Sequence, residues 1–262
     1  MKKYILAVSI AMALVLSACG STGTESVSES VSETESIAAS QEEVSSSETE
    51  ESEESSEAAE SEAAALPELA EYVPVEGLST TYADLDNRAF AYDGKVYKLG
   101  EVTLQELIDA GLPFDSGDLK NADNNINGNH ETTAYNLKIN DQNSMQFRFI
   151  NSTDNDLTEK ECILSSVRWY PLYVPHDDYQ ESLNTDIINY LNDCSTHLTF
   201  AFPLYVKKSE LLENSPEPTK SDEYNNVSYT TKSEVYMGSS GYSFQFDKDT
   251  EQIKDVTISW MP

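Results

Sequence analysis

The sequence predicts an α+β fold made of two related units, each a short helix followed by antiparallel strands, after a disordered acidic linker. Composition gives the first observation: residues 20–65 hold 14 Glu, 14 Ser and no aromatic residue, whereas residues 66–262 hold 24 Phe, Tyr and Trp. The second is that apolar and polar residues alternate in the aromatic runs, which is typical of half-buried strands. The third is that three segments of residues 66–170 recur in the same order in residues 171–262.

The charge of the chain excludes one large class of function. Sixteen Lys and Arg stand against 47 Asp and Glu, which gives a formal net charge of −31. Proteins that bind the phosphate backbone need a cationic surface that releases counterions. We therefore expect no nucleic acid partner.

Residues 1–18 have the order of a secretory signal peptide. Lys2 and Lys3 open the sequence, and an apolar run of 13 residues follows from Tyr4 to Leu16. A helix that crosses a bilayer needs about 20 apolar residues, so this run is too short to span one.

The residues that follow the apolar run suggest a lipid anchor. Leu16, Ser17 and Ala18 precede Cys19, and this pattern resembles the lipobox of bacterial lipoproteins, such as the surface lipoproteins of Gram-positive bacteria. The resemblance implies that Cys19 carries a diacylglyceryl group and fatty acids such as palmitate. Two acyl chains give a stable anchor, at about 0.8 kcal/mol for each buried CH₂. The lipid bilayer is then a partner through acylated Cys19, and the expected location is the outer face of the cell membrane.

Residues 19–65 are expected to form a disordered tether behind this anchor. A Ser/Glu-rich segment cannot bury enough apolar area to offset the entropy of ordering it. Its coil dimension is roughly 40 Å, and repulsion between the glutamates extends it further. The alternative is an acidic ligand for a basic partner.

Two elements are predicted near the start of the folded part. Residues 88–99 read as a β-hairpin, because Asp93 and Gly94 separate two short aromatic runs. Residues 104–110 read as a helix, because Thr103 and Glu106 have the spacing of a capping box and Gly111 supplies a stop.

Two strands follow from alternation. The segments 145–149 (MQFRF) and 242–246 (YSFQF) alternate large apolar and polar residues, so each is expected to be an antiparallel strand with one wet face. Ser239 and Ser240 are expected to form a hairpin loop that leads into the second strand.

The internal repeat rests on three segment pairs whose offsets are 104, 97 and 91 residues. Preserved order with loops of different length is expected of two diverged copies rather than of a solenoid with a fixed period. We therefore predict a first unit at 66–170 and a second at 171–262. The pairs are QELIDAG (105–111) with SELLENS (209–215), MQFRFINSTD (145–154) with YSFQFDKDTE (242–251), and SVRW (166–169) with TISW (257–260).

This order of elements resembles the tandem helix-plus-sheet units of β-lactamase-inhibitor-protein-like domains. The resemblance implies two similar units, each a helix followed by antiparallel strands, and it brings no catalytic residue with it.

One loop has half of a calcium-binding pattern. Asp123, Asn125, Asn127 and Gly128 match the first half of such a loop, whose oxygen ligands alternate before a Gly turn. The twelfth position, where a bidentate acid is needed, is Ala134. A turn-rich loop explains the Asn and Gly equally well, and we assign no metal here.

Cys162 and Cys194 remain if Cys19 is lipidated. In an oxidising compartment this pair allows a disulfide, and the alternative is two separately buried thiols. With His176 and His197 they also make a four-ligand zinc list, but their spacing lacks the close cysteine pair typical of zinc sites. The histidines, His130 included, are therefore interpreted as ordinary ones.

The enzyme interpretation has no strong anchor in the sequence. Asp177 with Asp178, or Asp84 with Asp86, could act as acid and base in glycoside cleavage if folding set two carboxylates about 5 to 10 Å apart. The sequence has no GxSxG elbow, phosphate-binding Gly-rich loop or HExxH pair.

We therefore expect a non-catalytic binding module at the cell envelope, with no cofactor. An acidic surface favours an envelope protein or a neutral glycan as partner. The alternative is a surface hydrolase that acts on glycan or peptide through paired carboxylates.

Overall fold

The computed structural model describes residues 67–262, which belong to one compact unit. The predicted signal peptide, lipidation site and acidic tether lie outside the described residues. The described helices are α1 (Leu104–Asp109), α2 (Glu181–His197) and α3 (Lys208–Glu213), with 3-10 turns at η1 (Asp118–Asn121) and η2 (Glu159–Glu161). None of the helices in this part of the chain combines the length and apolarity that crossing a bilayer requires.

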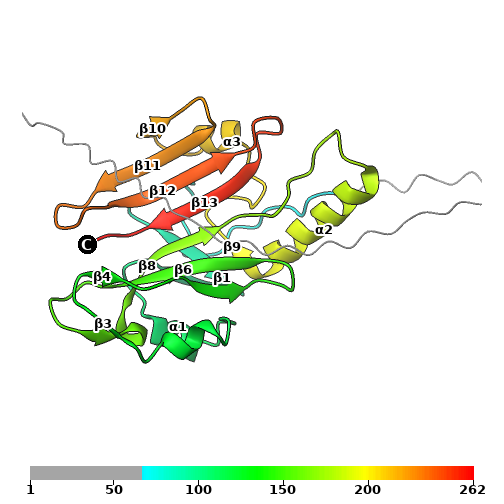
Figure 1. Ribbon diagram of the computed structural model, residues 1–262. Coiled ribbons are helices and arrows are strands. Elements are labelled where there is room, and N and C mark those ends of the chain that lie inside the picture. Colours follow the sequence, from blue (N-terminus) through cyan, green and yellow to red (C-terminus); the bar gives the residue numbers. More distant parts are fainter. Residues whose placement is uncertain (1–66) are drawn as a thin grey trace, which may run out of the picture. The chain divides into compact units, whose positions relative to one another are not determined.

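One large antiparallel sheet dominates the fold (Figure 1). Its order is β10-β11-β12-β13-β8-β6-β4, and β5 also pairs with β6. Its strands are β4 (His130–Glu131), β5 (Tyr135–Lys138), β6 (Ser144–Asn151), β8 (Ile163–Trp169), β10 (Lys220–Ser221), β11 (Asn226–Lys232), β12 (Ser239–Phe246) and β13 (Ile253–Ser259).

Two smaller sheets accompany it. A three-stranded sheet has the order β2-β1-β9, with β1 (Ala89–Tyr92), β2 (Lys95–Lys98) and β9 (Leu198–Thr199). The strands β3 (Asn125–Ile126) and β7 (Leu157–Thr158) pair with each other.

The two halves of the sequence share the large sheet. β8, which ends at Trp169, pairs with β13 through residues 166–169, so the predicted boundary at residue 170 falls just after a central strand. Mixed helices and mainly antiparallel strands make the fold class α+β, as the sequence predicts.

The core lies against one face of the large sheet. A single row of buried side chains crosses six strands, and each member is at most 2% exposed. The rings of Phe147 and Phe90, 5.4 Å apart, join this row to the β1–β2 hairpin. The row consists of Tyr229, Tyr242, Ile258, Val167, Phe147 and Tyr135.

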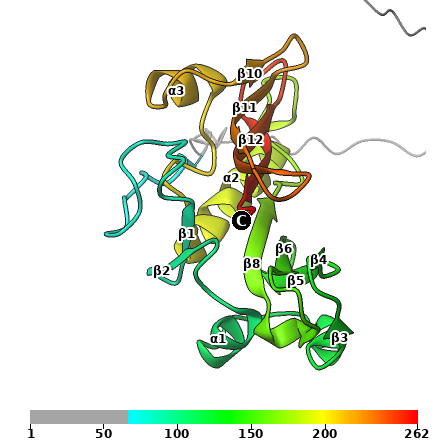
Figure 2. The ribbon, with the colours of Figure 1, turned by 90° about the vertical axis from the view of Figure 1, so that its left-hand side faces the viewer.

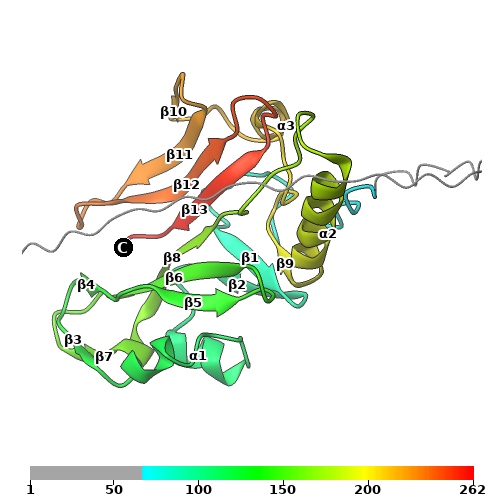
Figure 3. The same ribbon diagram turned by 45° about the vertical axis from the view of Figure 1, so that its right-hand side comes forward.

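The covering elements lie on that same side. Figure 2, with the large sheet close to edge-on, shows α1, α3 and the β1–β2 hairpin on one side of it. The segment after α2 contributes Phe202, whose ring is 5.2 Å from that of Phe244 on β12. Figure 3 shows α2 running down to β9, which lies beside β1 in the three-stranded sheet.

Two of the local predictions are confirmed. β1 and β2 form the expected hairpin, and both Asp93 and Gly94 have the positive φ that a two-residue turn requires. The helix predicted at 104–110 is α1, with Thr103 and Glu106 bonded as a capping box and Gly111 in the left-handed region.

Both predicted strands are confirmed, as β6 and β12, and one loop prediction is wrong. Ser239 and Ser240 begin β12 rather than forming a loop before it. Strand pairing extends because the Ser240 hydroxyl accepts the N–H of Met261 and donates to its carbonyl, which ties the strand start to the C-terminal residues.

Candidate functional site

The open face of the large sheet carries a continuous row of polar side chains. Register places one residue of the row on each of seven strands, directly opposite its neighbours. Thr257 on β13 and Arg168 on β8 form its centre, where the two halves of the sequence meet. The row runs Lys220, Ser228, Ser243, Thr257, Arg168, Gln146 and Asn136.

Two shorter rows flank it on the same face. One runs from Ser259 through Ser166 to Arg148, and the other from Asn226 through Gln245 to Asp255. The open sheet face is defined here as the thirteen residues of these three rows. Side chains alternate between the two faces of a strand, so the buried row fixes the position of every polar one.

The open sheet face is poor in acids for so acidic a protein. Its thirteen residues include three bases, Lys220, Arg168 and Arg148, and one acid, Asp255. Arg168 donates to Asp255 through Nε at 2.8 Å, and this hydrogen bond raises the pKa of the guanidinium. The Arg168 guanidinium also lies 5.5 Å from the ring of Tyr170.

A shallow depression of about 420 Å³ lies on this face. Arg168, Lys220, Gln245 and Asp255 are among its lining residues. Ser, Asn and Gln side chains supply both donors and acceptors, so the depression can exchange hydrogen bonds with a polar ligand or an extended backbone.

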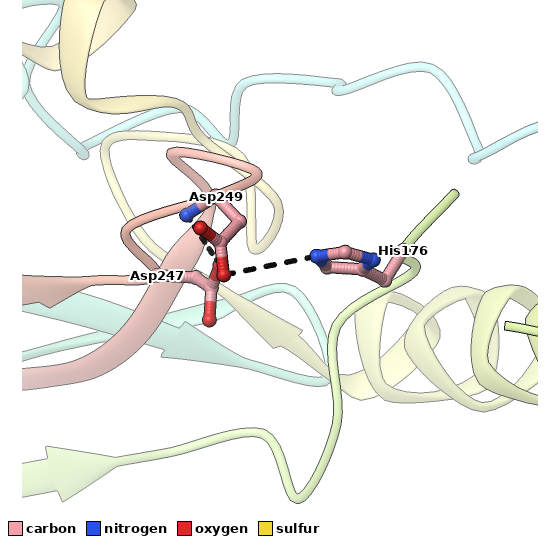
Figure 4. A group of neighbouring side chains, drawn as sticks. All are labelled: His176, Asp247 and Asp249. Carbon is pink, nitrogen blue, oxygen red and sulfur yellow. Dashed lines mark hydrogen bonds and ion pairs between the residues drawn. The ribbon is translucent and has the colours of Figure 1, made fainter. Parts of the chain in front are cut away.

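A second cluster contains a histidine and two aspartates. Within residues 67–262, His176, Asp247 and Asp249 are the one group of three potential metal ligands whose ligand atoms all lie within 4.8 Å of one another. His176 comes from the loop before α2, and both aspartates come from the turn between β12 and β13 (Figure 4). The Nε2 atom of His176 is 3.9 Å from Oδ2 of Asp249.

The aspartates of this cluster already have partners. Oδ1 of Asp247 accepts the N–H groups of Asp249 and Thr250 at 2.9 and 3.0 Å, and its Oδ2 lies 3.5 Å from Lys254 Nζ. Partial burial opposes the ionisation of Asp247, but these N–H groups and Lys254 outweigh it and hold the pKa of the carboxyl below its ordinary value. Asp249 lies 3.7 Å from Lys248. The arrangement is that of a capped turn with ion pairs, and we assign no metal to it.

The calcium-like loop has a different geometry from a calcium site. Asn125 lies in β3 and pairs with Thr158 of β7, and Asp123 forms an ion pair with Lys160. Gly128 packs against the backbone of Thr153 and Asp154, where a Cβ would approach to 2.6 Å. The loop is therefore a packed turn, the alternative that its Asn and Gly content allowed.

The two cysteines are separate buried thiols. Cys162 follows η2, and Cys194 lies on the buried side of α2. Burial raises the pKa of Cys162 to about 11 and that of Cys194 to about 12. The disulfide that the sequence allowed is not formed in this structure.

The four residues of the zinc list do not form a site, because within the described residues no three of them bring their ligand atoms within 4.8 Å of one another. His197 instead bonds to Asp93 Oδ1 at 2.7 Å and stacks on Tyr92, and His130 lies against the carbonyl of Gly128. These are structural roles.

The candidate acids have local roles as well. Asp84 accepts the Ser79 hydroxyl at 2.7 Å and the N–H of Asp86 at 2.9 Å, so it organises the loop before β1. Asp177 and Asp178 are exposed on the loop before α2.

Sequence reasoning did not identify the open sheet face as a row of matched residues. Alternation in β6 and β12 indicated a wet face, but the alignment of seven strands depends on pairings between distant segments. The sequence analysis also did not predict α2, although its apolar residues have helical spacing: Leu183, Ile187, Leu191 and Cys194.

The chain matches no protein-family model, and the searches of curated proteins and of solved structures likewise returned no match.

Proposed function

We propose that this protein is a lipid-anchored, non-catalytic binding module at the outer face of the cell membrane. Acylated Cys19 would anchor the protein in the membrane, and the acidic tether would set how far the folded part extends from it. The folded part would hold the open sheet face toward an envelope protein. Tethering raises the local concentration of the module near membrane partners and so makes a weak affinity sufficient.

The polar row on the open sheet face carries this proposal. It crosses both halves of the sequence from Lys220 to Asn136, and the elements α1, α3 and β1 lie on the other side of the sheet. The face holds more bases than acids, so a partner docking there meets less of the repulsion that the net charge of −31 would otherwise exert.

We also propose that the two halves are related copies. The β6–β8 pairing has an irregularity between Arg148 and Phe149, and the β12–β13 pairing has one between Gln245 and Phe246. The offset of 97 residues between these positions equals that of the segments MQFRFINSTD and YSFQFDKDTE. Bulges are retained within families, so a shared bulge supports common descent.

The helices dock in matching ways. Thr103, the N-cap of α1, bridges to Ile163 at the start of β8, and Lys207, the N-cap of α3, bridges to Gln252 just before β13. Each helix has six residues, and the offset from Thr103 to Lys207 is the 104 residues of the helix segments.

The tyrosines favour a protein over a glycan. Sugar rings are bound by aromatic side chains that face solvent together, but the three rows of the open sheet face contain no aromatic residue. Five tyrosines are buried, and Tyr170 lies beside the face under Arg168. The buried ones are Tyr92, Tyr97, Tyr135, Tyr229 and Tyr242.

The anchor is tested by metabolic labelling of the full chain with an alkyne fatty acid. Wild-type protein should take up the label and sediment with membranes, and Cys19→Ala should lose both properties. An unlabelled wild type, or a Cys19→Ala protein that stays in the membrane, would refute the anchor.

The binding face is tested by placing a photo-crosslinking residue at Ser243 of the full chain in cells. A discrete adduct with one envelope protein should form, and Gln245→Arg should remove it because a bulky cation then stands beside the crosslinker. Ser116, an exposed serine off the sheet, is the matched position. A crosslinker there should give no such adduct, and Ser116→Arg should leave the Ser243 adduct intact. Equal adducts from both positions would count against the proposal.

The hydrolase alternative predicts that the purified chain cleaves wall glycan or peptide fragments. The binding module that we propose predicts no cleavage of these fragments in a chromatographic assay. Cleavage that is abolished by Asp84→Asn or Asp177→Asn would replace the binding module with the hydrolase.

A further inference from the structure

An apolar groove lies between α2 and the loop that precedes it. Its volume is about 430 Å³, and its walls also include Gln142 from the turn between β5 and β6. Binding pockets with mainly apolar walls typically have volumes of about 300–1,000 Å³, so this groove has room for a few bulky apolar groups. The lining residues besides Gln142 are Leu172, Tyr173, Leu183, Asp186, Ile187 and Tyr190.

The groove gathers large apolar side chains that have no cover. Leu172 is 55% exposed, Tyr173 60% and Leu183 42%. Single apolar residues on a surface are common, but three that line one concave site indicate a place where something binds.

α2 explains how the groove is built. Ile187, Leu191 and Cys194 point from the helix into the core, whereas Leu183, Ile187 and Tyr190 are spaced to form a second, adjacent stripe. Tyr190 is held in place because its hydroxyl accepts a hydrogen bond from the amide of Asn143. The apolar surface of α2 is therefore wider than the part that the core covers.

The segment that supplies every wall of the groove except Gln142 is acidic, and its Asp186 lines the groove itself. Residues 169–206 contain five acids and no Lys or Arg: Asp177, Asp178, Glu181, Asp186 and Asp193. Asp141 adjoins Gln142 on the facing turn, and Lys138, at the start of that turn, lies 4.0 Å from Asp115. These acids favour a cationic occupant, both on the α2 side of the groove and on the side of the facing turn.

Charge also decides among the possible occupants. The tether of this chain carries 14 Glu and no aromatic residue, and a second copy would bring the same five acids. An anionic lipid surface would be repelled in the same way. A basic segment of another protein meets both the apolar groove and the acidic rim.

We propose that the groove binds a basic protein segment that inserts one or two aromatic or aliphatic side chains between α2 and residues 172–173. The apolar anchors supply most of the affinity, and the flanking Lys or Arg of the segment supply its selectivity. This docking site is separate from the open sheet face and does not rest on the function proposed for that face.

The test uses residues 20–262, which include every described residue, and three fluorescent peptides. The first is a 16-residue amphipathic peptide with Leu and Phe on one face and Lys on the other. The second has Glu in place of Lys, and the third has Ser in place of Leu and Phe. Anisotropy titrations should show binding of the first peptide alone, weakened at least tenfold by Leu183→Ser and by Tyr173→Ser.

Tyr224→Ser is the matched control, because Tyr224 is 72% exposed and lies away from the groove on the loop before β11. It should leave the affinity unchanged, and so should Ser243→Arg on the open sheet face. All these positions are exposed, and circular dichroism checks that each variant keeps its fold. Binding of the acidic or the Ser peptide with equal affinity, or binding that survives Leu183→Ser, would overturn the proposal.

Two further measurements separate the other occupants. If the chain binds phosphatidylglycerol vesicles and Leu183→Ser abolishes this, the groove is a membrane contact and the proposal is wrong. If sedimentation shows a dimer that Leu183→Ser dissociates, the occupant is a second copy and the proposal is equally wrong. We expect neither vesicle binding nor a dimer.

Discussion

Val167 on β8 lies directly opposite Ile258 on β13, and the two are the second residues of the segments SVRW and TISW, which we propose to be related. When SVRW is aligned with TISW, Ser166 matches Thr257 and Arg168 matches Ser259. The alignment therefore converts the neighbouring pair Ser166–Ser259 into the other neighbouring pair, Thr257–Arg168. An antiparallel pair centred on matching residues has local twofold symmetry, and this is the join between the two halves of the large sheet.

This join predicts that the two halves unfold together. Trp169 ends β8 and Trp260 follows β13, so each half carries one tryptophan. Because both strands share one core, urea unfolding followed by Trp260 fluorescence in a Trp169→Phe variant should coincide with the far-UV circular dichroism transition of that variant. Two separated transitions would show that the halves are independent domains.

The helix caps offer a test based on the internal comparison. Thr103 caps α1 with Glu106, whereas at the corresponding place of α3 the residue is Lys207, which makes no side-chain cap, followed by Glu210. Thr103→Ala should lower the free energy of unfolding by about 1 kcal/mol, because an N–H at the helix start loses its acceptor. A decrease in Tm of roughly 2–4 °C is expected for a domain of this size.

The converse substitution, Lys207→Thr, should stabilise the protein by about 0.5–1 kcal/mol, since Glu210 already stands at the third helical position. Lys207→Ala is the matched control and should give no comparable gain. A Lys207→Thr variant that melts below wild type would mean that the two helices are not capped in equivalent ways.

Asp222 should make stability depend on pH at the acidic end. The N–H of Asn226 and the ammonium of Lys220 stabilise its carboxylate, and together they lower the pKa of Asp222 to about 2. Because the folded pKa lies below the unfolded value of about 4, the stabilisation is complete above pH 4 and is lost as the pH falls from about 4 to about 2.

Asp222→Asn should therefore be less stable than wild type at pH 7 and should lose less stability between pH 4 and pH 2. Urea midpoints measured across this range give the comparison. Asp156→Asn, at an exposed loop position, is the control and should follow wild type. Parallel curves for Asp222→Asn and wild type would refute the role of this carboxylate.

Cys162 and Cys194 should be unreactive in the native protein. Burial raises the pKa of Cys162 to about 11 and that of Cys194 to about 12, and the thiolate is the reactive form. Residues 20–262 should not react with Ellman's reagent at pH 8 and should release two equivalents in 6 M guanidinium without a reductant. No reaction in guanidinium would show that the two form a disulfide.

Local features of the fold were predictable because neighbours in sequence determine them. Asp93 and Gly94 take positive φ whatever the strands pack against, and Thr103 with Glu106 closes a capping box within one turn. The alternation in MQFRF and YSFQF fixes which side chains share a face of the strand.

Tertiary structure decided everything that depends on pairing between distant segments. Strand register can shift without changing the sequence pattern, so no local rule places Arg168 between Gln146 and Thr257. The groove likewise needs Gln142, Tyr173 and Leu183 from three segments. The sequence alone determined the acidic charge, the lipobox-like segment before Cys19 and the local elements at residues 88–110, 145–149 and 242–246. The tertiary structure decided which surfaces those elements leave open, because a surface is what remains after long-range packing has covered the rest.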